Sequence, residues 1–134
     1  MKKLFEYSIH TSRRDEFINI THLVEKSISE SKVSEGLCTI FVPHTTAGVT
    51  INENADPDVV YDITNHLSSI VPHRSDFAHM EGNSDSHIKS SIIGASLTII
   101  ISGGKPLLGT WQGIYFAEFD GPRQRKLYIK CIEG

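Results

Sequence analysis

Gly36-Leu37-Cys38-Thr39-Ile40-Phe41-Val42 is a short, almost continuous apolar run, and it decides the fold class. A run so short and so rich in β-branched residues predicts a central strand covered on both faces. Alternating apolar and polar residues at 4–9 predict a strand before it. Strands are also expected at 97–102, 113–119 and 126–132.

Helices are expected in the stretches between these strands. One helical face collects Ile20, Leu23, Val24, Ser27 and Ile28. A second helix begins at Asp56-Pro57, where aspartate caps free N–H groups and proline suits the first helical position. Its predicted buried stripe is Val59, Ile63, Leu67 and Ile70. A polar loop at 73–85 and a short helix at 88–93 complete the pattern.

Two main helices mixed with strands predict an α+β fold, in one compact domain spanning residues 1–134. We expect a mainly antiparallel sheet or sandwich. Asp120-Gly121 is a strong turn signal, so the last two strands should form a hairpin.

Composition narrows the classes of function. The 134 residues carry a net charge of −3 without a basic stripe, which argues against nucleic-acid binding. The longest apolar stretch, 97–101, is far shorter than the roughly 20 residues that span a bilayer, so we expect no membrane partner. Cys38 and Cys131 are expected to be buried thiols in a reducing compartment, with a disulfide or a nucleophile as alternatives. A cytoplasmic protein is the resulting expectation.

Polar residues follow the central strand directly, at Pro43-His44-Thr45-Thr46-Ala47-Gly48. The end of a buried strand holds such residues rigidly and leaves them accessible. His44 can act as a ligand or base, and the hydroxyls of Thr45 and Thr46 can bind an anion. The alternative is that His44 only ends the strand and the threonines satisfy local backbone groups.

Two histidines and two carboxylates fall within one short segment, His79-Met80-Glu81-Gly82-Asn83-Ser84-Asp85-Ser86-His87. Imidazoles and carboxylates together suit zinc or another divalent metal. If a helix begins at Ser84, its free N–H groups, next to Asn83, could hold a phosphate. If Asp85 and His87 are extended instead, they share one face. A solvated polar loop is the alternative.

Together, His44, His79 and His87 would supply three protein ligands of a tetrahedral metal site with one open position. Glu53 or Glu81 could complete the site or act as a base, and Asp85 could orient an imidazole or be the base itself. These assignments make Asp85, Glu53 and Glu81 the candidate catalytic carboxylates.

Two further motifs could contact a ligand. Trp111 and Gln112 lie between glycines and offer a planar apolar surface beside an amide, which suits a ring; a core tryptophan is the alternative. Arg123 and Arg125 flank the predicted turn and could grip a phosphate, although arginines at such turns are usually only solvated.

Four motifs resemble the YjbQ family, also called the secondary thiamine-phosphate synthase family. They are His44–Glu53, Glu81–Lys89, Leu108–Gln112 and Phe119–Arg123. The motifs occur in the family's order, and the resemblance covers nearly the whole chain, from Leu4 to Ile132.

The resemblance implies a compact α+β fold that assembles as a homotrimer, with sites near subunit boundaries. It implies a bound metal and an anion near His44, His79, Asp85 and His87. The activity that it implies is weak thiamine-phosphate synthesis, in which a pyrimidine diphosphate joins a thiazole phosphate and releases pyrophosphate.

The leading hypothesis is therefore an enzyme that acts on a small phosphorylated or anionic metabolite with a divalent metal ion, zinc first. Its main competitor is a non-catalytic trimeric module that binds a metal or metabolite. A third possibility is a structural trimer in which the histidines pin the subunits together.

Overall fold

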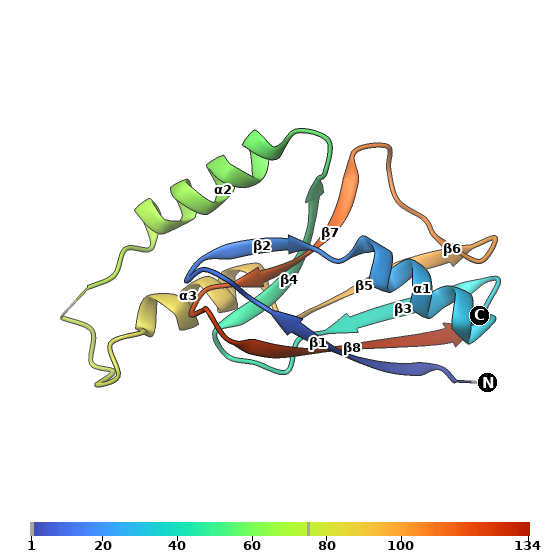
Figure 1. The fold of residues 1–134 in the computed structure, drawn as a ribbon, viewed down its shortest axis with the longest axis horizontal. Coiled ribbons are helices and arrows are strands. Elements are labelled where there is room, and N and C mark those ends of the chain that lie inside the picture. Colours follow the sequence, from blue (N-terminus) through green and yellow to red (C-terminus); the bar gives the residue numbers. More distant parts are fainter. Residues whose placement is uncertain (1, 75) are drawn as a thin grey trace.

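The computed structural model describes residues 2–74 and 76–134, and Figure 1 shows its arrangement of strands and helices. The predicted α+β class is confirmed. In chain order, the elements of the described residues are β1 (Leu4–His10), β2 (Glu16–Asn19), α1 (Thr21–Ser31), β3 (Gly36–Phe41), β4 (Ala47–Glu53), α2 (Pro57–Ile70), α3 (Ser84–Ile93), β5 (Ser96–Ser102), β6 (Lys105–Pro106), β7 (Gln112–Glu118) and β8 (Gln124–Glu133).

The strands form two antiparallel sheets. The larger has the order β1-β8-β3-β5-β6, and the smaller has the order β2-β7-β4. The predicted hairpin between the last two strands is wrong, because β7 pairs with β2 and β4 whereas β8 pairs with β1 and β3. A turn does follow β7, but it carries the chain from one sheet to the other.

The main core lies between the two sheets and is closed by α1. It consists of inward-facing aliphatic and aromatic side chains, such as Phe5, Val24, Ile40, Phe116 and Leu127. A smaller cluster on the other face of the small sheet joins α2 and α3 to β7 through Leu67, Val71, Ala117 and Phe119.

The strand covered on both faces is β7, not β3. Residues 113–118 of β7 are all buried, because the main core covers one face and the helices cover the other. In β3, Cys38 and Ile40 point inward, but Leu37 is 47% exposed and Phe41 is 46% exposed. The apolar run of β3 therefore leaves hydrophobic side chains on the outer face of the larger sheet.

The two cysteines are buried and free, as expected. Cys38 and Cys131 lie directly opposite each other across β3 and β8. Burial raises the pKa of the Cys38 thiol, and the neighbouring Cys131 raises it further. A protonated, solvent-excluded thiol is a poor nucleophile, which removes these cysteines from the candidate chemistry.

Three strands, β2, β4 and β6, are not predicted from the sequence, and β6 has only two residues. β2 is only four residues long. β4 mixes small and polar residues, and its Gly48 allows close packing under the end of α3. A Cβ atom at Gly48 would lie 2.5 Å from the carbonyl oxygen of Gly94. This contact brings the C-terminal end of α3 onto β4.

The helices begin where the capping residues indicated, with two differences. The Asp56 side chain accepts a hydrogen bond from the Asp58 N–H at the start of α2, as predicted. Of the predicted buried stripe, only Leu67 is fully buried, and Ile70 is 60% exposed. Helix α3 begins at Ser84 rather than at residue 88, which is the helix start that the alternative for this segment required. No described helix is long and apolar enough to cross a membrane.

Candidate functional site

A buried ion pair lies where the chain repeatedly crosses between the two sheets. Glu118 at the end of β7 pairs with Arg125 in β8, and these side chains are 0% and 3% exposed. The Arg125 Nε donates to Glu118 Oε1 at 2.8 Å, and its Nη2 donates to the Thr46 hydroxyl at 2.8 Å. Arg125 is thus committed to the interior and is not available as the phosphate ligand considered from the sequence.

The same pair ties together three crossings between the sheets. Glu118 accepts a hydrogen bond from the Thr11 hydroxyl, in the β1–β2 connection, at 2.8 Å. It also accepts from the backbone N–H of Asp120, after β7, at 3.0 Å. Thr46, the partner of Arg125, lies in the β3–β4 connection. Burial alone would raise the pKa of Glu118, but hydrogen bonds from Arg125, Asp120 and Thr11 lower it below its usual value.

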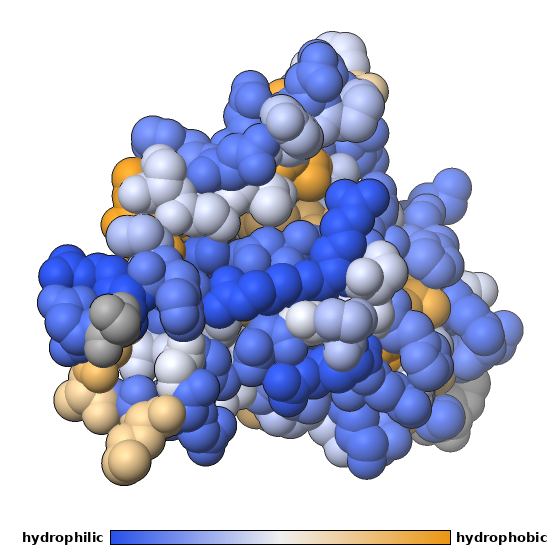
Figure 2. Space-filling model, turned by 60° about the vertical axis from the view of Figure 1, so that its left-hand side comes forward, coloured by the Kyte–Doolittle hydropathy of each residue, from blue (hydrophilic) through white to orange (hydrophobic). Residues whose placement is uncertain are grey.

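A cavity of about 280 Å³ opens at the start of α3, and Thr46, which binds Arg125, is part of its wall. Its wall consists of side chains from four separate segments. Most of these side chains are candidate site residues predicted from the sequence. Figure 2, with the left-hand side of Figure 1 turned forward, shows a largely hydrophilic face with hydrophobic patches at its upper left and lower left. The residues that line the cavity are Thr45, Thr46, His79, Glu81, Asn83, His87, Asp120 and Arg123.

The start of α3 offers groups that can bind a ligand. The N–H groups of a helix's first turn have no acceptor within the helix, and they carry partial positive charge. Asn83 does not cap them with its side chain. Its Nδ2 instead donates to Asp120 at 2.9 Å, and its buried Oδ1 has no hydrogen-bond partner among the described residues. An unsatisfied buried acceptor beside a cavity suits a ligand that donates or carries positive charge.

Two of the predicted metal ligands lie side by side in this cavity. The rings of His79 and His87 are edge to face, with centroids 5.3 Å apart. The Glu81 Oε1 lies 4.0 Å from the His79 Nε2. Two imidazoles and one carboxylate form a donor set that fits zinc. Within residues 2–74 and 76–134, no three His, Cys, Asp or Glu side chains are already close enough to hold an ion.

His44 lies on the other side of Thr45 and is engaged by the backbone. Its Nε2 accepts a hydrogen bond from the Lys126 N–H at 2.9 Å. Burial lowers the pKa of His44, and the charge of Arg125 lowers it further, so the ring is neutral near pH 7. The single proton of a neutral ring with an accepting Nε2 resides on Nδ1. In this arrangement His44 is a hydrogen-bond donor rather than a partner of His79 and His87 around one ion.

Arg123 lies at the cavity but is not free of partners. Its Nε donates to the backbone oxygen of Asp120 and its Nη2 donates to the Asp120 carboxylate, both at 3.0 Å. The side chain is 49% exposed. The remaining guanidinium N–H groups stay available to an anion.

Asp85 is not brought to the cavity, although it was a candidate base. Its side chain is 1% exposed and accepts from Arg14 at 3.0 Å and from His73 at 3.3 Å. Burial alone would raise the pKa of Asp85, but the hydrogen bonds from His73 and Arg14 lower it. The carboxylate thus ties the start of α3 to the β1–β2 connection through Arg14, and to the residues just after α2 through His73. Nearby, the buried Lys89 pairs with Asp15 at 2.6 Å and strengthens the same attachment.

Three predicted residues lie at the far end of the smaller sheet. Glu53 and Gln112 are register partners at that end of β4 and β7, whereas Ala47 and Glu118 are partners at the cavity end. Six steps along a strand separate the two ends by roughly 20 Å. Trp111 is 63% exposed at the far end. Within one chain, Glu53, Trp111 and Gln112 therefore do not contribute to the cavity.

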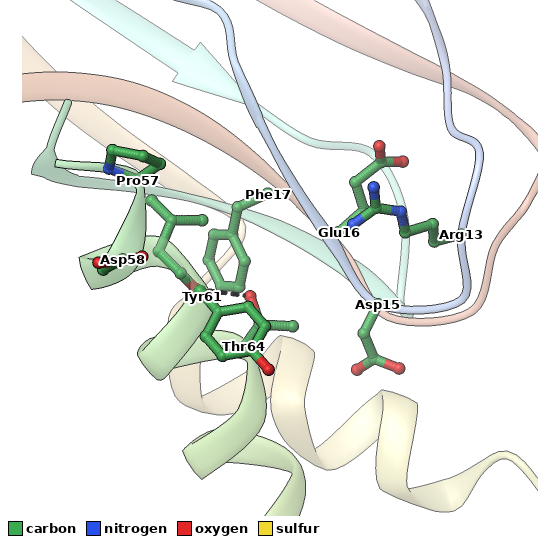
Figure 3. Close-up of a pocket in the computed structure, with 9 residues that line it drawn as sticks. Arg13, Asp15, Glu16, Phe17, Pro57, Asp58, Tyr61 and Thr64 are labelled. Carbon is green, nitrogen blue, oxygen red and sulfur yellow. Dashed lines mark hydrogen bonds between the residues drawn. The ribbon is translucent and has the colours of Figure 1, made fainter. Parts of the chain in front are cut away.

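A separate cavity of about 430 Å³ lies between α2 and β2, and it was not predicted from the sequence. Figure 3 shows Phe17 beside Tyr61 and Thr64 of α2, with Arg13 and Glu16 at the other end. Asp15 points toward α3, where Lys89 binds it. No histidine or cysteine is among its lining residues. The cavity at the start of α3 therefore holds the candidate chemistry.

Comparison with known proteins identifies the family. A family model described as "UPF0047 protein YjbQ-like" matches residues 5–134. The chain belongs to the YjbQ-like UPF0047 family. It is 61% identical over 132 residues to the UPF0047 protein MJ1081 of Methanocaldococcus jannaschii. This alignment covers 98% of this chain and 96% of MJ1081. It is 53% identical over 126 residues to the UPF0047 protein YugU of Bacillus subtilis. That alignment covers 92% of this chain and 95% of YugU.

A solved structure supports the fold of this family member. A crystal structure of a YjbQ/UPF0047 family protein from Clostridium acetobutylicum superposes with a TM-score of 0.94 at 58% identity. The match covers 96% of this chain and 99% of that one. The names of these three relatives give a family and no reaction.

The lowered pKa values of Glu118 and Asp85 predict acid sensitivity. A carboxylate whose pKa is lower in the folded state contributes stability above its unfolded pKa of about 4, and this stability is lost as pH falls through the folded pKa. We expect Glu118→Gln to lower the free energy of unfolding at pH 7 by about 3–5 kcal/mol, because Arg125 is left unpaired. The variant should also lose less stability than the native chain below pH ~4.

Urea unfolding from pH 7 to pH 2 measures both effects. Glu6→Gln is the matched control, since the Glu6 carboxylate pairs with Lys126 on the surface at 3.8 Å. The control should change stability by about 1 kcal/mol or less. Equal effects of the two substitutions would contradict the role given to Glu118.

Proposed function

We propose that the cavity at the start of α3 binds a small phosphorylated or otherwise anionic metabolite together with a divalent metal ion, and that the protein is an enzyme acting on it. One observation supports the proposal above all: a guanidinium group, the start of a helix, two imidazoles and a carboxylate all line the same cavity. Arg123, Thr45 and the start of α3 suit the anion. His79, His87 and Glu81 suit the metal.

The metal ion, with zinc as the first choice, would be held by His79 and His87, with Glu81 completing the set. The unpartnered Asn83 Oδ1 supports this fit, because it is an acceptor with no donor among the described residues. A bound divalent ion stabilises negative charge that develops on a leaving oxygen. Arg123 and the first N–H groups of α3 would orient the anion and hold its charge beside His87.

The family resemblance adds a candidate reaction, the joining of a pyrimidine diphosphate to a thiazole phosphate with release of pyrophosphate. The cavity supports such chemistry through groups that bind phosphate oxygens. Its glutamate and two imidazoles also provide candidates for proton transfer. Trp111 would contact a ring in this site only if it came from a neighbouring subunit.

The main alternative is a non-catalytic module that binds the metal and a metabolite with the same residues. Turnover separates the two functions. Metal-loaded protein that binds phosphates tightly but never releases pyrophosphate from the paired substrates favours the binding module.

We also propose that the chain assembles as a homotrimer through the outer face of the larger sheet. Leu37 of β3 lies directly between Ile100 of β5 and Ile132 of β8 in the register of the sheet. All three are exposed, at 47%, 54% and 52%. Contiguous exposed aliphatic side chains on a sheet mark an association surface. Phe41 of the same strand extends the patch along β3.

The metal proposal predicts about one ion per chain in protein purified without chelators. His87→Ala should lower the metal content at least tenfold, because it removes one of few ligands. His66→Ala is the matched control, since His66 is an exposed histidine on α2 away from this cavity. Elemental analysis measures the content. Metal-free native protein, or full loading of the His87→Ala variant, would show the assignment to be wrong.

The anion proposal predicts that Arg123→Ala weakens binding of inorganic phosphate about tenfold, the loss expected for a charge-assisted hydrogen bond. Calorimetric titration of the metal-loaded protein measures the affinity. The matched control is Arg74→Ala, because Arg74 is also an exposed arginine paired with a nearby aspartate, Asp76. In the pyrophosphate-release assay, Arg123→Ala should reduce the rate and Arg74→Ala should not. Unchanged phosphate affinity in Arg123→Ala would contradict the anion site.

The trimer proposal predicts that Leu37→Asp shifts the molar mass in solution toward that of one 14.9 kDa chain. A carboxylate would be buried without a partner at the centre of the patch. His22→Asp adds a carboxylate at an exposed position of α1 and should leave the molar mass unchanged. Light scattering after size-exclusion chromatography measures both. Native protein that is monomeric at high concentration would rule out the assembly.

A further inference from the structure

A second cavity of about 500 Å³ adjoins the first and shares part of its wall. Thr45 and His87 line both cavities. The rest of the second cavity comes from the last turn of α3, the residues that follow it, and His44. Its side chains there are small: Ser90, Ser91, Gly94 and Ala95.

The two cavities differ in charge. The first contains Glu81, Asp120 and Arg123, whereas no Asp, Glu, Lys or Arg of residues 2–74 and 76–134 lines the second. Two of the three hydroxyls of the second cavity, those of its serines, also donate to backbone oxygens. Ser90 donates to Ala47 at 2.7 Å, and Ser91 donates to His87 at 3.1 Å. The second cavity therefore presents a largely uncharged surface next to a highly charged one.

His44 supplies the second cavity with a defined polar group. Its Nε2 is occupied by the Lys126 N–H, so Nδ1 carries the proton of the neutral ring. The ring of His44 thus offers a donor to a ligand acceptor in largely uncharged surroundings. A largely uncharged wall with a few placed polar groups is typical of sites for small organic molecules.

We propose that the two cavities are halves of one ligand site, in which the second takes the uncharged, ring-sized body of a ligand whose phosphate head occupies the first. The ligand class is a phosphate or diphosphate ester whose body accepts a hydrogen bond from His44. Because His87 and Thr45 form the shared wall, the bond between head and body lies beside them. This inference rests on the proposed function, since it takes the first cavity as the anion site.

Two probes separate head from body: inorganic phosphate and phenyl phosphate, each titrated into zinc-loaded protein at pH 7. We expect phenyl phosphate to bind about tenfold more tightly, the gain from burying roughly 60 Å² of apolar surface. Arg123→Ala should weaken both probes, because both place a phosphate in the first cavity.

Ser91→Leu fills the second cavity from the exposed side of α3 and leaves the first untouched. We expect it to reduce the affinity for phenyl phosphate to that for inorganic phosphate, with the latter unchanged. The matched control is Ser69→Leu, because the Ser69 hydroxyl also donates to the backbone of its own helix, at 3.0 Å, on the exposed surface of α2. The control should change neither affinity. If Ser91→Leu fails to fold, Ala95→Met fills the same space from the opposite wall and should give the same result.

The outcomes distinguish this inference from the proposed function. Equal affinities of native protein for the two probes, or equal weakening of both by Ser91→Leu, would overturn the second cavity while the anion site stands. Failure of both probes to bind would overturn the proposed function and this inference with it. Selective loss of phenyl phosphate binding supports the two-part site.

Discussion

The ion pair of Glu118 and Arg125 is the constraint on which the arrangement of this molecule depends. Three of the connections between the two sheets meet there, through Thr11, Thr46 and the backbone after β7. A buried ion pair adds little net stability compared with a well-packed apolar pair, because both charges lose water. Its value here is geometric. A carboxylate with several donors fixes the relative positions of the segments that supply them.

The candidate site is built on that junction. Thr45 and Thr46 lie in one of the fixed connections, and Asp120 and Arg123 lie in another. The remaining side of the cavity comes from α3 and the residues before it, which a second set of buried contacts attaches to the body. Arg14 binds Asp85, and Asp15 binds Lys89. Two separate charge networks, neither of which lies in the cavity, thus hold the two sides of the site at a set distance.

The fold class and most elements could be read from the sequence because they depend on local signals. Asp56-Pro57 marked the start of α2, and the apolar runs marked the long strands. Sheet membership could not be read, because the turn at Asp120-Gly121 is compatible with a hairpin and with a crossing between sheets. The same limit applied to β3, whose apolar side chains served an outer face rather than a second covering layer.

For the site, the sequence indicated which residue types could bind a ligand, but it did not indicate where their side chains point. His79, His87 and Arg123 do share a cavity, whereas Asp85 turns inward and Trp111 lies at the other end of the smaller sheet. A helix that begins at Ser84 places Asp85 and His87 on different sides, and only the three-dimensional start of α3 reveals this. Arg14 and Lys89 gave no sequence signal, since their importance comes from partners far along the chain.

The position of β8 has a consequence for how the chain acquires its structure during translation. This strand, residues 124–133, lies between β1 and β3, which are both made much earlier. Until β8 has emerged from the ribosome, no strand connects β1 to β3. The inner face of the larger sheet then stays open to water. The nascent chain therefore has to remain unaggregated until β8 has emerged, after which the larger sheet can close.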